Sequence, residues 1–524
     1  MISRILGLLY YFPFIWLVGI QGAALYAYAY NPYVVLLSIA TVGLPLAVSK
    51  FVSKYNALGD YKTGRRLFYS GIIVMLGTGF ATFLILFLSA EAIAPMFIGE
   101  GDATGNSLED VAFVIRVVSF ALLVVPVMSL IRGYFQGFNS MGPTAVSQVV
   151  EQLVRIAFIL LSSFIIVIVL KGERTTAVAF AVFAAYVGAL GGLAVLLWYW
   201  RKRKPHLDKL VQESTVEHDI SLFSMYKELL SYAIPFVIVG LAIPIYQQID
   251  TLTMVKTLIH TGMTQAEAEA VFATVNQTTN KIIMIPVSLA TALGLTLIPT
   301  ITKTYTEKNQ IKLQQQISQT YQMLLYLTLP AAIGLSVLAY SAYGALYGVN
   351  DVALGGEILR WYAPTAVLFA IFTASAAILQ GINQQKLAVF ALLCGVLVKM
   401  LLNRPFIEKW EGIGAIAATD IGYIISILFC LYAIKKYARI SFQLIMKRTL
   451  LIGMLTTVMG IVVWIVKWPF ELLLASGYTS DANYFLVVFI LIIGVITGGA
   501  VYLWMGNRLN LIKIIFGRKL PFFK

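Results

Sequence analysis

The sequence predicts an all-α, polytopic membrane protein with fourteen transmembrane helices. Only 12% of the 524 residues are charged and 60% are hydrophobic, whereas soluble globular proteins contain roughly 25% charged residues. Apolar runs of about 20 residues recur along the whole chain, and each is long enough to cross roughly 30 Å of hydrocarbon. A membrane β-barrel would show alternating segments of about 10 residues instead. The composition therefore predicts helical spans throughout.

Fourteen spans account for the apolar runs. They are expected at residues 2–20, 26–52, 66–90, 111–133, 143–170, 176–200, 226–256, 271–302, 316–341, 356–381, 385–403, 412–435, 448–467 and 483–506. The first helix is expected to be short at its inner end, which leaves open whether the N-terminus is complete. An even number of spans brings both chain ends to the same side of the membrane.

The loops between these spans alternate in charge. The basic set contains Lys50, Lys54, Lys62, Arg65, Arg66, Arg201, Lys204, Lys303, Lys308, Lys312, Lys435, Lys436 and Arg439. The other set contains Glu91, Glu100, Asp102, Glu109, Asp110, Glu267, Glu269, Asp351, Glu357, Glu471 and Asp481. Because excess Lys and Arg in short loops marks the cytoplasmic side, both termini are expected in the cytoplasm. The net charge of +14 then reflects membrane orientation and not nucleic-acid binding.

One half of the chain resembles the other. The matches include Gln136, Gly137 and Asn139 with Gln380, Gly381 and Asn383, Pro13 and Phe14 with Pro235 and Phe236, and Arg155 with Lys399. Each copy holds six helices, an even number, so the two are expected to be parallel repeats about an axis along the membrane normal. The predicted organisation is an N-lobe at 1–203, a cytoplasmic linker at 204–225, a C-lobe at 226–438, and two extra helices with a basic tail at 439–524.

The stretch 132–155, R-G-Y-F-Q-G-F-N-S-M-G-P-T-A-V-S-Q-V-V-E-Q-L-V-R, is polar where lipid-facing residues are expected. Arg132 is interpreted as a residue of its cytoplasmic turn. Glu151 and Arg155 are four residues apart, so they share a helix face and can pair. Two interpretations remain open: a self-neutralised pair that joins two helices, or one wall of a cavity.

Other ionisable residues also fall inside apolar spans, where they are costly and usually face a cavity. Lys281 has no acid within one helical turn, so a substrate anion is one candidate partner. Lys399 is the repeat mate of Arg155. Arg4 lies near the cytoplasmic end of the first helix, where it is either a site residue or an ordinary snorkelling cation. Asp250 is a candidate for a coupling cation or proton, with a salt bridge as the alternative.

The predicted substrate-binding residues are Arg4, Glu151, Arg155, Lys281 and Lys399, and cations outnumber acids among the deep residues. A cationic cavity favours an anionic substrate, since phosphate attracts Arg and Lys. The chain contains no P-loop, zinc motif or nucleophile elbow. We therefore expect no catalytic residues, no metal, no cofactor and no enzymatic activity. The two cysteines, Cys394 and Cys430, are expected to be buried apolar residues.

Four segments carry a resemblance to a known family: S-R-I-L-G in the first helix, the stretch 132–155, N-K-I-I-M-I-P-V-S-L-A-T-A-L at 280–293, and G-I-G-A-I-A-A-T-D-I-G-Y at 412–423. With them the chain resembles the polysaccharide biosynthesis/SpoVB branch of the MOP exporter superfamily, and within it the YtgP/MurJ-type lipid II flippases of Gram-positive bacteria. The sequence departs from Gram-negative relatives at Tyr10 and Tyr11, where those carry Arg and Asp. The eleventh helix lacks the acidic residue of a sodium site, so sodium is not predicted.

The resemblance implies a multi-pass protein of the bacterial cell membrane. It would carry an undecaprenyl-diphosphate-linked peptidoglycan precursor from the inner to the outer leaflet by alternating access. Basic residues, Arg4 and Lys281 among them, would hold the diphosphate, and the two extra helices would shape a groove for the polyprenyl tail. The expected partners are this lipid, the membrane and cell-wall synthesis proteins, with the chain a monomer. Alternatives are a flippase for another undecaprenyl-linked glycan, a cation-coupled multidrug exporter and a non-transporting scaffold.

Overall fold

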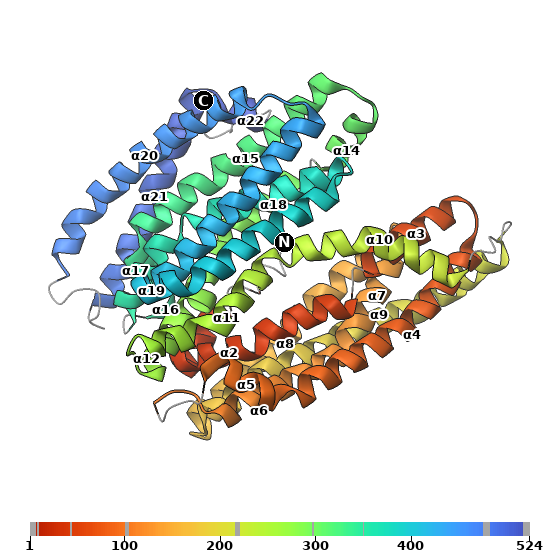
Figure 1. Cartoon of the computed structure of the whole chain (residues 1–524), viewed down its shortest axis with the longest axis horizontal. Coiled ribbons are helices and arrows are strands. Elements are labelled where there is room, and N and C mark those ends of the chain that lie inside the picture. Colours follow the sequence, from red (N-terminus) through yellow and green to blue (C-terminus); the bar gives the residue numbers. More distant parts are fainter. Residues whose placement is uncertain are drawn as a thin grey trace. The chain divides into compact units, whose positions relative to one another are not determined.

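The computed structural model describes residue 7 and residues 10–41, 44–99, 104–214, 221–295, 298–348, 351–474 and 483–516. Within these ranges all regular secondary structure is helical (Figure 1), so the predicted all-α class is confirmed. Arg4 lies outside the described residues. Side chains of a few residues inside helices, such as Tyr232 and Leu444, are likewise not described.

The helices follow one another along the chain with short connections. They are α2 (Tyr11–Thr41), α3 (Leu44–Ala57), α4 (Tyr61–Leu88), α5 (Ala90–Ile98), α6 (Leu108–Ser119), α7 (Ala121–Gly137), α8 (Met141–Phe164), η1 (Ile165–Val169), α9 (Arg174–Gln212), α10 (Leu222–Gly240), α11 (Ala242–His260), α12 (Gln265–Ala273), η2 (Thr274–Thr279), α13 (Asn280–Leu295), α14 (Ile298–Thr306), α15 (Gln310–Val337), α16 (Ala339–Tyr347), α17 (Val352–Tyr362), α18 (Thr365–Gly381), α19 (Gln385–Ala438), α20 (Gln443–Leu472), α21 (Tyr484–Arg508) and α22 (Leu511–Phe516). The two elements named η are π-helices.

Nine helices in the described part of the chain are long and apolar enough to cross a membrane, or up to eleven if each of two bent helix pairs counts as one span. The total of fourteen therefore stays a prediction. Two helices, α2 and α19, each cover parts of two expected spans, and each contains a point where the backbone is not helical. Gly19 interrupts α2 with φ 71°, a backbone conformation that glycine adopts without strain. Trp410 and Glu411 interrupt the 54-residue α19, close to the expected boundary between the eleventh and twelfth spans.

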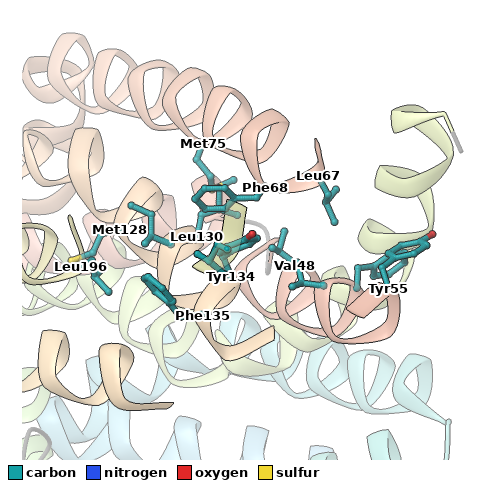
Figure 2. Close-up of a cluster of buried hydrophobic side chains, with 14 of the residues drawn as sticks. Val48, Tyr55, Leu67, Phe68, Met75, Met128, Leu130, Tyr134, Phe135 and Leu196 are labelled. Carbon is teal, nitrogen blue, oxygen red and sulfur yellow. The ribbon is translucent and has the colours of Figure 1, made fainter. Parts of the chain in front are cut away.

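The chain divides into two compact units, Met1–Ala270 and Val271–Lys524. In the first unit α8 packs along α9, and α7 packs against both α3 and α4. A core cluster of this unit joins α3, α4, α7 and α9, and Figure 2 shows Phe68 and Tyr134 lying together in it, with ring centroids 4.2 Å apart. Trp200 of α9 stacks on Phe68 at 5.0 Å. Aromatic contacts therefore anchor the long α9 to the core of its unit.

Among its described residues, 204–214 and 221–225, the expected linker is mostly helical. The helix α9 continues to Gln212, and α10 begins at Leu222. Both α10 and α11 pack within the first unit, α10 against α3 and α11 against α2 and α5. The predicted lobe boundaries stay a prediction.

The second unit is built around α15, α18, α20 and α21. Its larger core cluster includes Tyr326, Met459, Val463 and Tyr502, contributed by α15, α20 and α21. The Tyr502 hydroxyl donates to the Tyr326 carbonyl at 3.0 Å. Figure 1 shows α20 and α21, the two helices outside the predicted repeat, running side by side in blue. They close one flank of this unit against α15 and α16.

Candidate functional site

The turn between α7 and α8 has the same backbone conformation as the turn between α18 and α19. Asn139 and Asn383 both have positive φ, at 54° and 59°. The amide of Ser140 donates to the Phe135 carbonyl, and that of Gln384 donates to Leu379 in the same way. Asparagine is among the few non-glycine residues that tolerate this conformation. The sequence match between these two turns is thus also a structural match.

Glu151 forms its ion pair with Arg132, whose Nη2 lies 2.7 Å from Oε2 of Glu151. The Nε of Arg132 donates to Oγ of Ser147 at 2.9 Å. The interpretation of Arg132 as a turn residue is wrong, because it lies inside α7 and is buried. Its position opening the motif R-G-Y-F-Q-G is the one signal in the sequence that could have singled it out. The charge of Glu151 is therefore neutralised from α7.

Arg155 is surrounded by tyrosines. Its Nη2 donates to the Tyr26 hydroxyl at 3.2 Å, and its Cζ lies 5.4 Å from the centre of the Tyr30 ring. The Tyr26 hydroxyl lies 3.4 Å from that of Tyr10. Within the described ranges no carboxylate lies at ion-pair distance from Arg155, and its Nε has no hydrogen-bond partner. Arg155 is half-buried. Because its partners are neutral tyrosines, they orient the guanidinium but do not neutralise its positive charge.

Glycines of α9 allow the close approach of α8 that positions these side chains. A Cβ atom on Gly188 would lie 2.9 Å from both the Glu151 carbonyl oxygen and the Arg155 Cβ. A Cβ atom on Gly192 would lie 3.1 Å from the Glu151 Cβ. Larger residues at either position would push α9 away from the charged face of α8.

Lys281 follows directly on the buried π-helix η2, at the start of α13. Polar side chains of η2 and of the first residue of α13 hold this segment: Thr278 Oγ1 lies 3.3 Å from the Tyr343 hydroxyl, and Asn280 Nδ2 donates to the Tyr362 hydroxyl at 3.0 Å. The buried Oε1 of Gln277 accepts no hydrogen bond from the described residues. Isolated π-helical turns within helices frequently occur at functional sites. Lys281 itself is half-buried and belongs to the second unit.

Lys399 has a different environment from its repeat mate Arg155. It is fully buried, and its Nζ donates to the Ala415 carbonyl and to Oγ1 of Thr419, each at 2.8 Å. Both acceptors lie beyond the break in α19, so Lys399 connects the two segments of that helix. Nearby in sequence, Asp420 accepts a hydrogen bond from Thr365 at 2.6 Å.

Asp250 is buried in α11 of the first unit. The adjacent Thr251 accepts a hydrogen bond from Nδ2 of Asn31 at 2.8 Å, which joins α11 to α2. The predicted site residues are therefore divided: Glu151, Arg155 and Asp250 belong to the first unit, and Lys281 and Lys399 to the second. Within the described ranges, no three His, Cys, Asp or Glu side chains are grouped so that they could hold a metal ion.

The second unit contains an apolar groove of about 520 Å³. We define the tail groove by its lining from α13, α15, α16, α20 and α21, which includes Ile282, Pro286, Leu289, Leu327, Pro330, Gly334, Leu335, Leu338, Met459, Val463, Gly494, Val495, Gly498 and Gly499. Gly494 allows α21 to pack closely against Leu338 in the wall of the groove, since a Cβ on Gly494 would lie 2.7 Å from the Leu338 side chain. A groove beside the two extra helices is among the features that the family resemblance implied.

Two family models match the chain, and a curated relative aligns with its whole length. Residues 1–305 match the family model described as polysaccharide biosynthesis protein, and residues 248–480 match that of lipid II flippase MurJ. The chain is 48% identical over 524 residues to the lipid II flippase MurJ of Bacillus subtilis (strain 168), an alignment that covers all of this chain and 95% of that protein. It is also 23% identical over 450 residues to stage V sporulation protein B of the same organism, which covers 85% of this chain and 83% of that protein.

Solved structures share the fold. A lipid II flippase MurJ in an inward closed conformation matches with a TM-score of 0.62 and 15% identity, over 97% of this chain and 98% of that chain. An inward-facing multidrug resistance transporter of the MATE family, in the MOP superfamily, matches with a TM-score of 0.66, over 83% and 95% of the respective chains. Both similarities concern the arrangement of helices.

Proposed function

Because the chain belongs to the MurJ family of lipid II flippases, we infer that it moves lipid II across the bacterial cell membrane, and we propose that Arg155 contacts the diphosphate of this lipid. The observation that supports this role is the environment of Arg155: a half-buried guanidinium with tyrosine partners and no carboxylate among the described residues. A diphosphate can form charge-assisted, bidentate hydrogen bonds with such a group. The phenol rings keep the guanidinium oriented without competing for its charge.

Glu151 is proposed to act on the site through Arg132. Their ion pair removes a negative charge that would otherwise weaken the attraction between Arg155 and a phosphate one helical turn away. Lys281 is proposed as a second phosphate contact, supported by its position next to the polar η2 segment. The contacts of Lys399 favour a structural role at the break of α19. Asp250 stays the candidate for a coupling cation or proton.

The tail groove is proposed to hold the polyprenyl chain of lipid II. Its walls are almost wholly apolar, and it is bordered by α20 and α21. Polyprenyl chains carry no hydrogen-bonding groups, so a groove lined mainly by apolar side chains suits them. Transport would proceed from the inner to the outer leaflet by alternating access, with both termini in the cytoplasm. The distribution of Lys and Arg among the loops supports this orientation.

The role of Arg155 can be tested by complementation of a strain depleted of its own lipid II flippase. Arg155→Ala is expected to abolish growth and outer-face lipid II, and Arg155→Lys to restore part of both, because an ammonium keeps the charge but loses the bidentate geometry. Lys171→Ala, which removes an exposed cation two residues beyond the end of η1, serves as the matched control and should behave as wild type. Normal lipid II accessibility with Arg155→Ala, at equal protein abundance, would refute a contact with the diphosphate.

A further inference from the structure

A second, smaller pocket lies in the second unit, next to the tail groove. It has a volume of about 200 Å³, and we define the headgroup pocket by its lining: Ser336, Val337, Tyr340, Arg360, Trp464 and Lys467. On both α15 and α20 its residues directly follow residues of the tail groove, Leu335 and Val463. Unlike the groove, it presents two cations. Neither cation belongs to the diphosphate site proposed above.

Specific contacts build this pocket. Oγ of Ser336, near the end of α15, donates to the Arg360 carbonyl at 2.7 Å and so ties α17 to α15. Gly356 has no side chain, and a Cβ there would lie 2.4 Å from the Tyr340 ring, so the ring packs directly on α17. Arg360 lies one turn further along that helix, four residues on, and therefore shares the face of Gly356. These contacts fix the backbone of α17 at Arg360 relative to α15 and Tyr340.

The two cations differ in how they are held. Nζ of Lys467 lies 2.9 Å from Oε1 of Glu471, and the Lys467 side chain is only 12% exposed. The side chain of Arg360 is exposed, and within the described ranges its guanidinium has no hydrogen-bond or carboxylate partner. With Glu471 counted, the pocket carries one net positive charge. That charge matches a phosphodiester, which carries a single negative charge, better than a diphosphate.

One exposed tryptophan lines the pocket, and two more are sequence neighbours of its lining residues. Trp464 lines it, and Trp361 and Trp468 lie beside Arg360 and Lys467 in sequence; each of the three is more than half exposed. Tryptophan is enriched at the level of lipid headgroups. Lys467 lies near the end of α20 opposite to its basic start at Lys447, which is the outer end in the topology proposed above. From there the exposed apolar side of α20 runs back toward the membrane centre.

From this geometry we propose that the headgroup pocket binds the phosphodiester of an anionic phospholipid of the outer leaflet, with its acyl chains against the exposed apolar side of α20. Arg360 supplies the bidentate donor pair, and Lys467 supplies a second charge-assisted bond. The lipid is then a resident partner that fixes α17 to α20, separate from the transported lipid. This site does not depend on which lipid-linked glycan the protein carries.

The test is native mass spectrometry of the full-length protein with added phosphatidylglycerol or phosphatidylethanolamine. Wild type should retain phosphatidylglycerol in preference, and the double variant Arg360→Gln/Lys467→Gln should bind it at least about tenfold more weakly, the effect of losing two charge-assisted bonds. Glu471→Gln raises the net charge of the pocket and should tighten binding. Arg174→Gln removes an exposed cation at the start of α9 and should change nothing.

Arg360→Gln alone alters an exposed side chain and keeps the test valid should the double variant fold poorly. The proposal would be overturned if wild type, Arg360→Gln and Arg360→Gln/Lys467→Gln bound phosphatidylglycerol equally. It would also be overturned if the variants lost phosphatidylethanolamine binding to the same extent as phosphatidylglycerol binding. Two competitors distinguish other sources of phosphate. Displacement by inorganic phosphate would indicate a free-anion site, and preferential displacement by undecaprenyl diphosphate would assign the pocket to the transport route; either result would overturn the phospholipid assignment.

Discussion

Arg132 of α7 and Glu151 of α8 form an ion pair with 2.7 Å between Nη2 and Oε2, across the turn that joins the two helices. Their side chains are 11% and 23% exposed, so water hydrates neither charge well, and each charge compensates for the other. Because Glu151 pairs with Arg132, Arg155 on the next turn of α8 contacts tyrosines and does not pair with Glu151. One interhelical contact therefore determines which cation on this face remains available.

Replacing one member of this pair should destabilise the protein more than replacing both. Glu151→Gln leaves Arg132 buried without its carboxylate and is expected to cost about 1–3 kcal/mol. Adding Arg132→Gln removes the uncompensated charge, so the two changes should not be additive, with a coupling of about 0.5–3 kcal/mol. Thermal unfolding in detergent measures each variant. Strict additivity would contradict a direct pair.

Gly188→Ala should separate α8 from α9. The added Cβ would lie 2.9 Å from the Glu151 carbonyl oxygen, which is backbone and cannot move independently. Overpacking of this kind costs about 1–3 kcal/mol. Gly77→Ala is the matched control, since nothing lies within 4 Å of its Cβ position in α4. A lower melting temperature is expected for the first variant only, and flipping should fall with it because Arg155 loses its position.

Gly499→Leu should obstruct the tail groove without disturbing the fold. Gly499 lines the groove, and nothing lies within 4 Å of its Cβ position. A leucine there fills space that we assign to the polyprenyl chain, so outer-face lipid II should decrease while the melting temperature stays unchanged. Gly453→Leu in α20 also has free space at its Cβ but lies outside the groove, and it should flip normally. Equal activity of both variants would argue against a tail in this groove.

The start of α12 should respond to pH through Glu267. Its Oε2 accepts from the Thr264 amide at 3.0 Å and from the Thr264 hydroxyl at 2.8 Å, and these bonds lower the pKa of the exposed carboxyl. A lowered pKa means that the stabilisation is present above the unfolded-state pKa and is lost as pH falls through the folded-state value. Glu267→Gln should therefore lower the melting temperature at pH 7 and lose this effect near roughly pH 4.

A matched variant is available at another helix start. Glu173 is the exposed N-cap residue of α9 and makes no side-chain capping bond, so Glu173→Gln should have little effect at either pH. If Glu267→Gln and wild type differ by the same amount at pH 7 and pH 4, ionisation of Glu267 does not contribute to stability.

Much of the fold could be predicted because hydropathy and helix periodicity are local properties. The all-α membrane class and the matched turns at Asn139 and Asn383 both follow from short stretches of sequence. The boundary between the expected spans 385–403 and 412–435 also lies close to the non-helical backbone at Trp410 and Glu411. The angle at which the two helical segments meet was harder to predict, since it depends on what packs against each of them.

The sequence alone determined which charges enter the apolar segments, including Glu151, Arg155, Lys281 and Lys399. Only the tertiary structure decided which of them remain available. The spacing of Glu151 and Arg155 permits a pair, yet Arg132 from α7 takes the carboxylate. Arg155 and Lys399 match in sequence, yet one lies among tyrosines and the other is enclosed by main-chain and hydroxyl oxygens. The physical reason is that a charge binds the partners that packing brings to it, and helix–helix packing arises between segments distant in sequence.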